Sequence, residues 1–281
     1  MKKLFIFRRK KNYFTIVLLI LFSVISIYPL LYLLFYSLKT NDEIFYTNPF
    51  GIPLAPQFDN YRRAVQLFDI VGFFKNSMVI TLFSVMAILI LALPFSYAIS
   101  RMHWKLKNTV SFYLSLGLFI PIQVIIVPLS ILVKNMHISN TYLALIIPYI
   151  AFNLAFACMV LSSSFSSLPQ ELEESAFIDG SGVFRTFLEI MIPLVKPAIS
   201  TAIIFATMSI WNEYTLASIL ATDQKLKTLP VGLTSFVGEH STDWGAMGAC
   251  LVIASIPTVI LYLCCSEQVE KALTVSGAVK G

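Results

Sequence analysis

Charged residues are scarce in this chain. They make up 12% of its 281 residues, whereas hydrophobic residues make up 57%. A soluble domain carries about 25% charged residues. Half that share, together with apolar runs of about 20 residues, excludes an ordinary soluble protein and indicates a membrane protein. The length therefore sets a number of membrane spans rather than a number of soluble domains.

Several kinds of site are missing as well. Three scattered histidines form no metal-ligand pattern, so we expect no metal site. No G-x-x-x-x-G-K-[ST] phosphate loop occurs, so any ATP must be bound by another chain. The cysteines lack C-x-x-C spacing, which excludes the disulfide framework of a secreted domain and favours small buried hydrophobic residues. They lie within or at the end of apolar segments, as Cys158, Cys250, Cys264 and Cys265.

What the chain has instead is six apolar segments. Each is long enough to cross about 30 Å of hydrocarbon as a helix, and too uniformly apolar for a barrel strand. The segments are 13–37, 76–99, 109–132, 141–162, 197–220 and 244–265. We therefore predict an all-α membrane protein with six transmembrane helices. Its parts are an N-terminal tail (1–12), a six-span domain (13–265) and a C-terminal tail (266–281). No small-x-small cleavage site follows the first segment, which we interpret as an uncleaved anchor.

Lysine and arginine are distributed unevenly between the loops. With six spans both termini share one side, and that side holds 13 of the 20 Lys and Arg residues, against 7 on the other. Because cytoplasmic loops carry the excess, both termini and the loop 163–196 are predicted to be cytoplasmic. The net charge of +5 mostly reflects this bias, so we expect no nucleic-acid partner. The loop 39–75 then lies outside, with a short surface helix near 61–65, either as a partner contact or as a solvated lid.

The loop 163–196 is the one long acid-rich interruption of the apolar pattern. Three glutamates should lie in the first two turns of a short helix that has Pro169 in its first turn, and Gly180 should end this helix in a left-handed conformation. A second helix should run from Val183 to Ile192. Such short helices are marginal alone and need a docking surface. Lipid is one, but interfacial helices are usually basic, so the acidity of this loop favours a protein partner.

Three groups of residues in the same loop are separated by three and nine others: Glu174-Ser175-Ala176, Gly180 and Ile190-Met191-Ile192-Pro193. This motif resembles the EAA loop of permease subunits in ATP-binding-cassette (ABC) importers. Ser175 replaces an alanine of the motif and Ile192 a leucine. The stretch 211–214 (WNEY) resembles the carbohydrate branch, and the tail 277–281 is similar to the end of maltose-type permeases.

This resemblance implies a type I importer permease fold in which the loop is a coupling helix. It assigns contacts with an ATPase subunit to Glu173, Glu174, Ser175, Ala176, Asp179, Gly180, Ile190 and Pro193. It extends that contact to the tail residues Gly277, Lys280 and Gly281. The implied partners are a second homologous permease, an ATPase homodimer or heterodimer that binds ATP and Mg, and an extracytoplasmic solute-binding protein. The implied location is the cytoplasmic membrane of a prokaryote.

Polar residues inside the apolar segments are candidates for a substrate pathway. A carboxylate at bilayer depth costs roughly 2.5–3.5 kcal/mol, so it should face protein or water. Polar and aromatic side chains sharing one face of the fifth segment would suit the hydroxyls and ring faces of a carbohydrate. The candidates are Asn153, Trp211, Asn212, Glu213 and Tyr214. Alternatively, these residues form polar contacts that hold helices together.

The chain is therefore predicted to be a non-catalytic permease subunit of an ATP-driven importer for a sugar or oligosaccharide, working by alternating access. A polyol or amino-acid importer of the same superfamily is the nearest alternative. An ion-coupled secondary transporter would need several paired acids inside the membrane, and only Glu213 lies well inside a segment. An intramembrane enzyme would need an acid/base pair or a metal cluster there, and the sequence offers neither.

Overall fold

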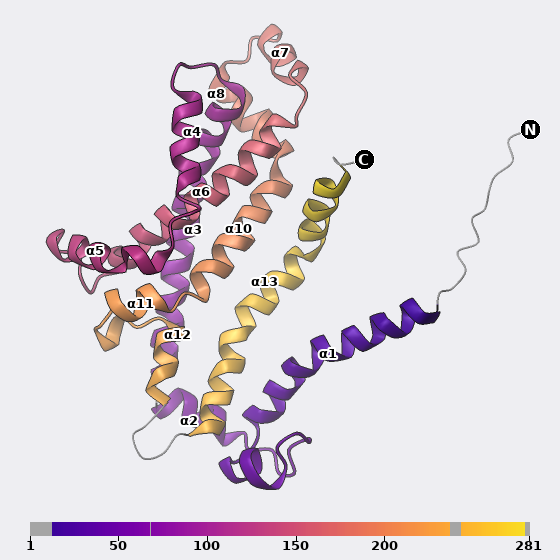
Figure 1. The fold of residues 1–281 in the computed structure, drawn as a ribbon, viewed down its shortest axis with the longest axis vertical. Helices are drawn as coiled ribbons and strands as arrows, with labels where there is room; N and C mark the ends of the chain where they lie inside the picture. The colour runs from indigo at the N-terminus through magenta and orange to yellow at the C-terminus, as the bar shows by residue number, and fades with distance from the viewer. Residues whose placement is uncertain (1–12, 68, 237–242, 279–281) are drawn as a thin grey trace, which may run out of the picture. The chain divides into compact units, whose positions relative to one another are not determined.

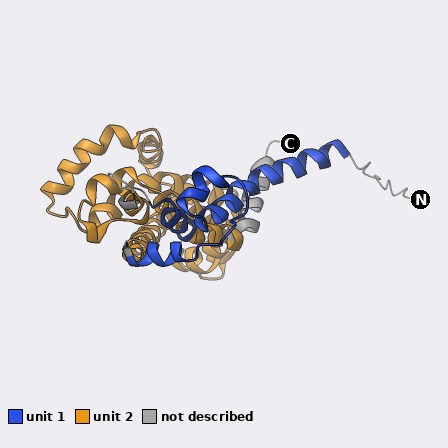
Figure 2. Cartoon of the chain, turned by 90° about the horizontal axis from the view of Figure 1, so that it is seen from below, with its two compact units in different colours: residues 1–68, 236–253 blue, residues 69–235, 254–281 orange. Residues whose placement is uncertain are grey.

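The computed structural model describes residues 13–67, 69–236 and 243–278, and throughout these residues it contains helices and no β-strand. The predicted all-α class is thus confirmed for the described part of the chain. Two compact units divide it, one formed by residues 1–68 with 236–253 and the other by residues 69–235 with 254–281 (Figure 2).

The first unit is held together by buried polar groups. Its helices are α1 (Tyr13–Ser37), the π-helical η1 (Glu43–Thr47), α2 (Asp59–Leu67) and the start of α13 (Trp244–Ala278). The buried Lys39 ammonium donates hydrogen bonds to the carbonyl oxygens of Asn48 (2.6 Å) and Pro49 (3.2 Å). The Asn60 amide donates to the carbonyls of Ser37 (2.8 Å) and Lys39 (2.9 Å). These bonds fix α2 against the segment after α1, and α2 confirms the short helix predicted near 61–65.

The second unit is a helical bundle that holds almost all of the remaining elements (Figure 1). In chain order they are α3 (Ile70–Arg101), α4 (Lys107–Leu116), α5 (Ile122–Asn135), α6 (Leu143–Ser166), α7 (Glu171–Ile178), α8 (Val183–Thr186), the π-helical η2 (Phe187–Met191), α9 (Ile192–Leu194), α10 (Lys196–Trp211), α11 (Thr215–Leu220), the 3₁₀ turn η3 (Gln224–Leu226), α12 (Leu229–Gly232) and the 3₁₀ turn η4 (Leu233–Phe236).

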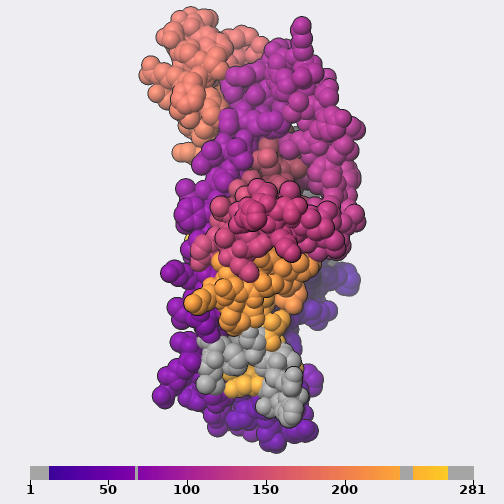
Figure 3. Space-filling view, turned by 90° about the vertical axis from the view of Figure 1, so that its left-hand side faces the viewer, coloured from indigo at the N-terminus to yellow at the C-terminus, as the bar shows by residue number. Residues whose placement is uncertain are grey.

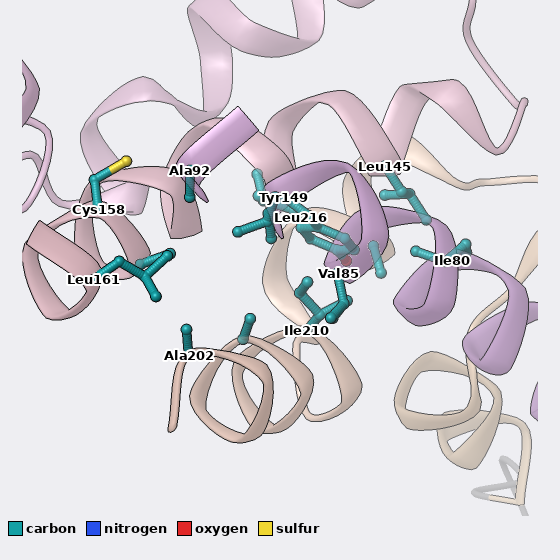
Figure 4. Packing of buried hydrophobic residues seen from close by; sticks show 14 of the residues in the cluster. Ile80, Val85, Ala92, Leu145, Tyr149, Cys158, Leu161, Ala202, Ile210 and Leu216 are labelled. Carbon is teal, nitrogen blue, oxygen red and sulfur yellow. The ribbon is translucent and has the colours of Figure 1, made fainter. Parts of the chain in front are cut away.

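The core of the second unit lies where α3, α6 and α10 pack together. Side chains from all three helices meet there, among them Val85 of α3, Leu161 of α6 and Ile210 of α10 (Figure 4). Small residues such as Ala92 and Ala202 line the same region and let the helix backbones approach closely. This bundle positions the ends of its helices and the loops that join them.

Four described helices are long and apolar enough to cross a membrane: Tyr13–Ser37, Ile70–Arg101, Leu143–Ser166 and Trp244–Cys264. A fifth is obtained if Val183–Leu194 and Lys196–Trp211, bent by 74° at their junction, count as one span. The first, second, fourth and sixth predicted segments thus correspond to continuous helices. The predicted count of six is not confirmed.

Local breaks in two of the predicted spans explain why fewer than six continuous helices of membrane length are found in the described part of the chain. The predicted third span, 109–132, divides into α4 and α5, because Pro121 lies in the extended conformation (φ −68°, ψ 134°) immediately before α5. Proline lacks the amide hydrogen that a continuous helix needs there. The predicted fifth span, 197–220, is interrupted at residues 212–214, between α10 and α11.

The cysteines are placed differently from one another. Cys158 and Cys250 are buried, as predicted, but Cys264 is exposed. Its part of α13 exposes other apolar side chains as well, including Ile260 and Leu263. The side chain of Cys265 lies outside the described part of the structure.

Candidate functional site: the loop between α6 and α10

The acid-rich loop forms its own projection at one end of the second unit. In Figure 1, α7 lies beyond the end of α6, and Figure 3 shows the same segment standing out from the surface. The loop therefore presents side chains that the bundle does not cover.

The ends of helix α7 follow in part from its residue types. Three glutamates occupy its first turn, where the positive end of the helix dipole favours carboxylates. At its end Gly180 has φ +81°, and the Ser181 amide donates to the Ala176 carbonyl (2.9 Å). The predicted left-handed glycine stop is confirmed. Pro169 lies outside the helix, contrary to prediction, because α7 starts only at Glu171, after Gln170.

The outward surface of this projection combines acidic and apolar groups. Glu174 and Ser175 are exposed on α7. Ile178 is 86% exposed at the end of α7, and Phe184 is 74% exposed on α8. Two large apolar side chains are thus left uncovered on the segment that also carries the exposed carboxylate of Glu174. Ala176, in contrast, is buried against the rest of the unit.

Glu173 points inward, unlike its neighbour Glu174. Its side chain is only 10% exposed, and one carboxylate oxygen accepts a hydrogen bond from the Tyr97 hydroxyl (2.6 Å). The other oxygen accepts from Nε of Arg101 in a salt bridge. Both partners lie in the last two turns of α3. The carboxylate is thus held within the protein instead of being offered to another chain.

Arg101 also binds the backbone just before α7. Its Nη1 atom donates to the Leu168 carbonyl (3.0 Å) and its Nη2 atom to the Pro169 carbonyl (3.2 Å). All three guanidinium nitrogens are therefore engaged with the loop. In the sequence, Arg101 served only as a positive charge for predicting membrane orientation, and Tyr97 was missed. Both residues lie more than 70 positions from Glu173, and no local pattern links residues so far apart.

The second half of the loop is less regular than predicted. The expected helix from Val183 to Ile192 consists of α8 followed by the π-helical η2, and Ile190 lies in that π-helical turn. Pro193 is exposed in α9, and the chain bends by 74° before α10. A π-helical turn and a proline both disturb the regular i to i−4 hydrogen bonds, which accounts for a bend here.

Glu213 lies in the break between α10 and α11, where it binds protein groups. Its carboxylate accepts hydrogen bonds from the Tyr149 hydroxyl (2.7 Å) and from the backbone amides of Leu216 (2.8 Å) and Ala217 (3.1 Å). It therefore caps α11 and ties it to α6. The single polar face predicted for 197–220 does not exist, because the helix that would carry it ends at Trp211.

The other pathway candidates are dispersed. Trp211 is buried and donates its indole N–H to the Ala254 carbonyl (3.1 Å). The side-chain amides of Asn153 and Asn212 each donate to the carbonyl four residues earlier on their own helix. Tyr214 is exposed. The structure thus brings together Tyr149 and Glu213, but it does not gather the five candidates into one site.

The remaining predictions concern the tail and metals. Gly277 lies in the last turn of α13, and Lys280 and Gly281 lie outside the described residues. Within the described part of the chain no group of three or more His, Cys, Asp and Glu residues is placed to hold a metal ion.

Four described helices long and apolar enough to cross a membrane, together with the packed core and the projecting loop of the second unit, define a multi-pass membrane protein. Its family follows from comparison with known proteins. The chain belongs to the family of binding-protein-dependent transport system inner membrane components, whose model matches residues 91–275. It is thus a component of a transport system, as the resemblance of its loop implied.

Individual relatives match this chain over most of its length. The diacetylchitobiose uptake system permease protein NgcG of Streptomyces coelicolor is 33% identical over 247 residues, which are 87% of this chain and 82% of that protein. The trehalose/maltose transport system permease protein MalG of Thermococcus litoralis is 30% identical over 266 residues, 93% of this chain and 94% of that protein. Among solved structures, a chain of a bacterial ABC transporter involved in the import of the acidic polysaccharide alginate has the same fold, with a TM-score of 0.79 at 23% identity over 90% of this chain and 94% of that one.

Proposed function

We propose that this chain is the permease subunit of an ATP-driven importer for a sugar or oligosaccharide. The observation that carries the proposal is the projecting surface of α7 and α8, where the exposed Glu174 lies one helical turn from the strongly exposed Ile178 and α8 adds the exposed Phe184. Such a surface gains stability only when a partner covers its apolar groups and offers a positive group to its carboxylate. A separate ATPase subunit that binds ATP and Mg is that partner.

The remaining parts of the assembly follow from the family and from the charge distribution. The name of the family points to an extracytoplasmic binding protein that delivers the solute. A second homologous permease would cover the exposed apolar helices and complete a pathway. The excess of Lys and Arg supports a cytoplasmic location for both termini and for the loop 163–196, which brings the loop to the side where ATP is available.

The substrate class rests on the relatives. NgcG is named for diacetylchitobiose and MalG for trehalose and maltose, and both are similar to this chain over most of its length. A carbohydrate is therefore the solute that we propose. Within this chain Tyr214 and Asn212, which are exposed beside the break after α10, are the pathway candidates best placed to meet a solute, since Trp211 and Glu213 are bound to other protein groups.

Transport into vesicles tests this function. The chain is reconstituted into vesicles together with the permease, ATPase and binding protein that are encoded beside it. Uptake of labelled diacetylchitobiose, trehalose, maltose, mannitol and glutamine is then measured with and without internal ATP. We expect ATP-dependent uptake of a carbohydrate. Uptake of mannitol or glutamine alone would support the alternative solute classes. Sugar uptake by this chain alone, driven by an ion gradient, would contradict the proposal.

Docking of the loop is tested in the same vesicles by the double variant Glu174→Ala with Ile178→Ala. A charge-assisted contact contributes about 1.5–3 kcal/mol, so we expect ATP-driven uptake to fall at least about tenfold. The matched control is Glu189→Ala, which removes a carboxylate that is exposed on the same loop and paired with Arg185. Equal uptake by the double variant and the control would show that α7 is not the docking surface.

A further inference from the structure

The two adjacent glutamates of α7 have different surroundings. Glu174 is exposed, whereas Glu173 is buried and bound by Tyr97 and Arg101 of α3. A buried carboxylate with two charge-assisted or hydroxyl partners is unavailable to another chain. Its role therefore depends on the helices that it links.

What it connects is the projecting helix and a helix long enough to cross the membrane. The hydroxyl of Tyr97 and the Nε atom of Arg101 bind one carboxylate oxygen of Glu173 each. The Nη1 and Nη2 atoms of Arg101 bind the carbonyls of Leu168 and Pro169, between α6 and α7. A guanidinium is a rigid planar fork, so its three hydrogen bonds, together with the one from the Tyr97 hydroxyl, fix both the position and the orientation of α7 on α3.

Aromatic packing closes the other side of this contact. The Tyr97 ring lies 5.7 Å from the ring of Phe165 on α6 and 5.0 Å from that of Phe187 in η2. The hydroxyl is therefore aimed at Glu173 by a ring that has little freedom to turn. One residue of α3 thus contacts α6, α7 and η2 at once.

We propose that Tyr97 and Arg101 are positioning residues that clamp α7 to α3 through Glu173, so that a displacement of α7 by its partner is passed directly to α3. The inference rests on the proposed function, since it takes α7 as the docking helix. It adds the route by which movement of that helix reaches the membrane-spanning part: through the buried side chains at the end of α3, and not only along the chain through α6 and α10.

The clamp is tested by measuring the distance between α7 and α3 in the assembled complex. Native cysteines are replaced, spin labels are attached at Glu171→Cys on α7 and at the 67% exposed Ile90→Cys on α3, and distance distributions are recorded by pulsed electron paramagnetic resonance, with and without ATP. In the unchanged clamp we expect one narrow distribution under both conditions, because the two helices move together.

Three conservative variants each weaken one contact of the clamp while they keep a side chain of similar size. Tyr97→Phe removes only a hydroxyl, Arg101→Lys keeps the charge but not the fork, and Glu173→Gln removes the charge. Losing a hydrogen bond to a charged group changes an equilibrium by about tenfold or more, so the population with α7 released from α3 should rise by about that factor and should depend on ATP. Controls are Tyr262→Phe and Glu189→Gln, whose side chains are exposed.

The distance distributions distinguish a clamp from a purely structural contact. If the native complex assembles and a broad, ATP-dependent distribution appears in the three variants but in neither control, the clamp is supported. If the residues only help the chain to fold, the variants give less complex but the same narrow distribution, and the clamp is disproved. If the native chain recruits no ATPase subunit, the proposed function fails, and the clamp fails with it.

Discussion

Single carboxylates in this protein have roles that their neighbours in the sequence do not reveal. Glu173 and Glu174 are adjacent, yet one is bound inside the unit and the other faces outward. Glu213 lies where the chain breaks between two helices, and it accepts hydrogen bonds from three donors. A carboxylate is suited to such a place because it accepts several hydrogen bonds and donates none.

The first prediction concerns Glu213. In Glu213→Gln one oxygen becomes an amide group that faces hydrogen-bond donors, and the start of α11 loses part of its cap. We expect the variant to be destabilised by about 1–3 kcal/mol. Thermal unfolding of the detergent-solubilised protein measures the change. Asn212→Ala, which removes an exposed amide bound only within its own helix, serves as control. Equal melting temperatures of the two variants would contradict the capping role.

At the scale of elements, the loop between α6 and α10 is a short helix with a defined end, followed by an irregular and bent segment. Helix α7 has only eight residues, so its own hydrogen bonds cannot keep it folded in water. The contacts of Glu173 and the buried Ala176 hold it against the bundle from one side. Its glycine stop then directs the chain into α8, and this sets where Phe184 lies relative to Glu174.

The second prediction concerns this stop. Gly180 has φ +81°, a conformation that costs a residue with a side chain about 1–2 kcal/mol. Gly180→Ala should therefore shift the end of α7 and weaken binding of the ATPase subunit about tenfold. The matched control is Gly182→Ala, since Gly182 has an ordinary φ of −76° and open space around it. Titration of labelled ATPase subunit onto permease in nanodiscs measures both affinities, and a similar loss in the control would show that the left-handed backbone is not the cause.

At the scale of the whole molecule, the distribution of charge is the property that sets orientation. With the six spans predicted from the sequence, thirteen Lys and Arg residues lie on one side against seven on the other, which predicts that the loop 163–196 lies in the cytoplasm. The proposed function depends on this orientation, because an outward-facing loop would not meet a subunit that hydrolyses cytoplasmic ATP.

The third prediction tests the orientation directly. In a cysteine-free background, Gly182→Cys should remain unlabelled when a membrane-impermeant maleimide is added to intact cells, and should react after the cells are opened. Leu54→Cys, at a 77% exposed position in the loop 39–75, should react in intact cells. The reverse pattern would overturn the proposed orientation.

Much of the fold follows from local sequence. Hydropathy over about 20 residues predicted α1, α3, α6 and the membrane-length part of α13, because the solvation of an apolar helix depends on its own side chains. Gly180 and the acid-rich start of α7 were equally local signals. The prediction was wrong where continuity depended on one or two backbone positions, as at Pro121 and at residues 212–214, since an average over 20 residues hides such a break.

The residues alone were enough to predict a helical membrane protein and an acid-rich loop whose spacing resembles a docking motif. Three-dimensional packing was needed to establish which glutamate faces inward, which groups bind Glu213, and that Trp211 belongs to the core. The difference lies in the range of the interactions along the chain. A turn or an apolar span is set by neighbouring residues, whereas the partner of a buried carboxylate is chosen by packing. Packing brings Tyr97 and Arg101 to Glu173 across more than 70 residues of chain.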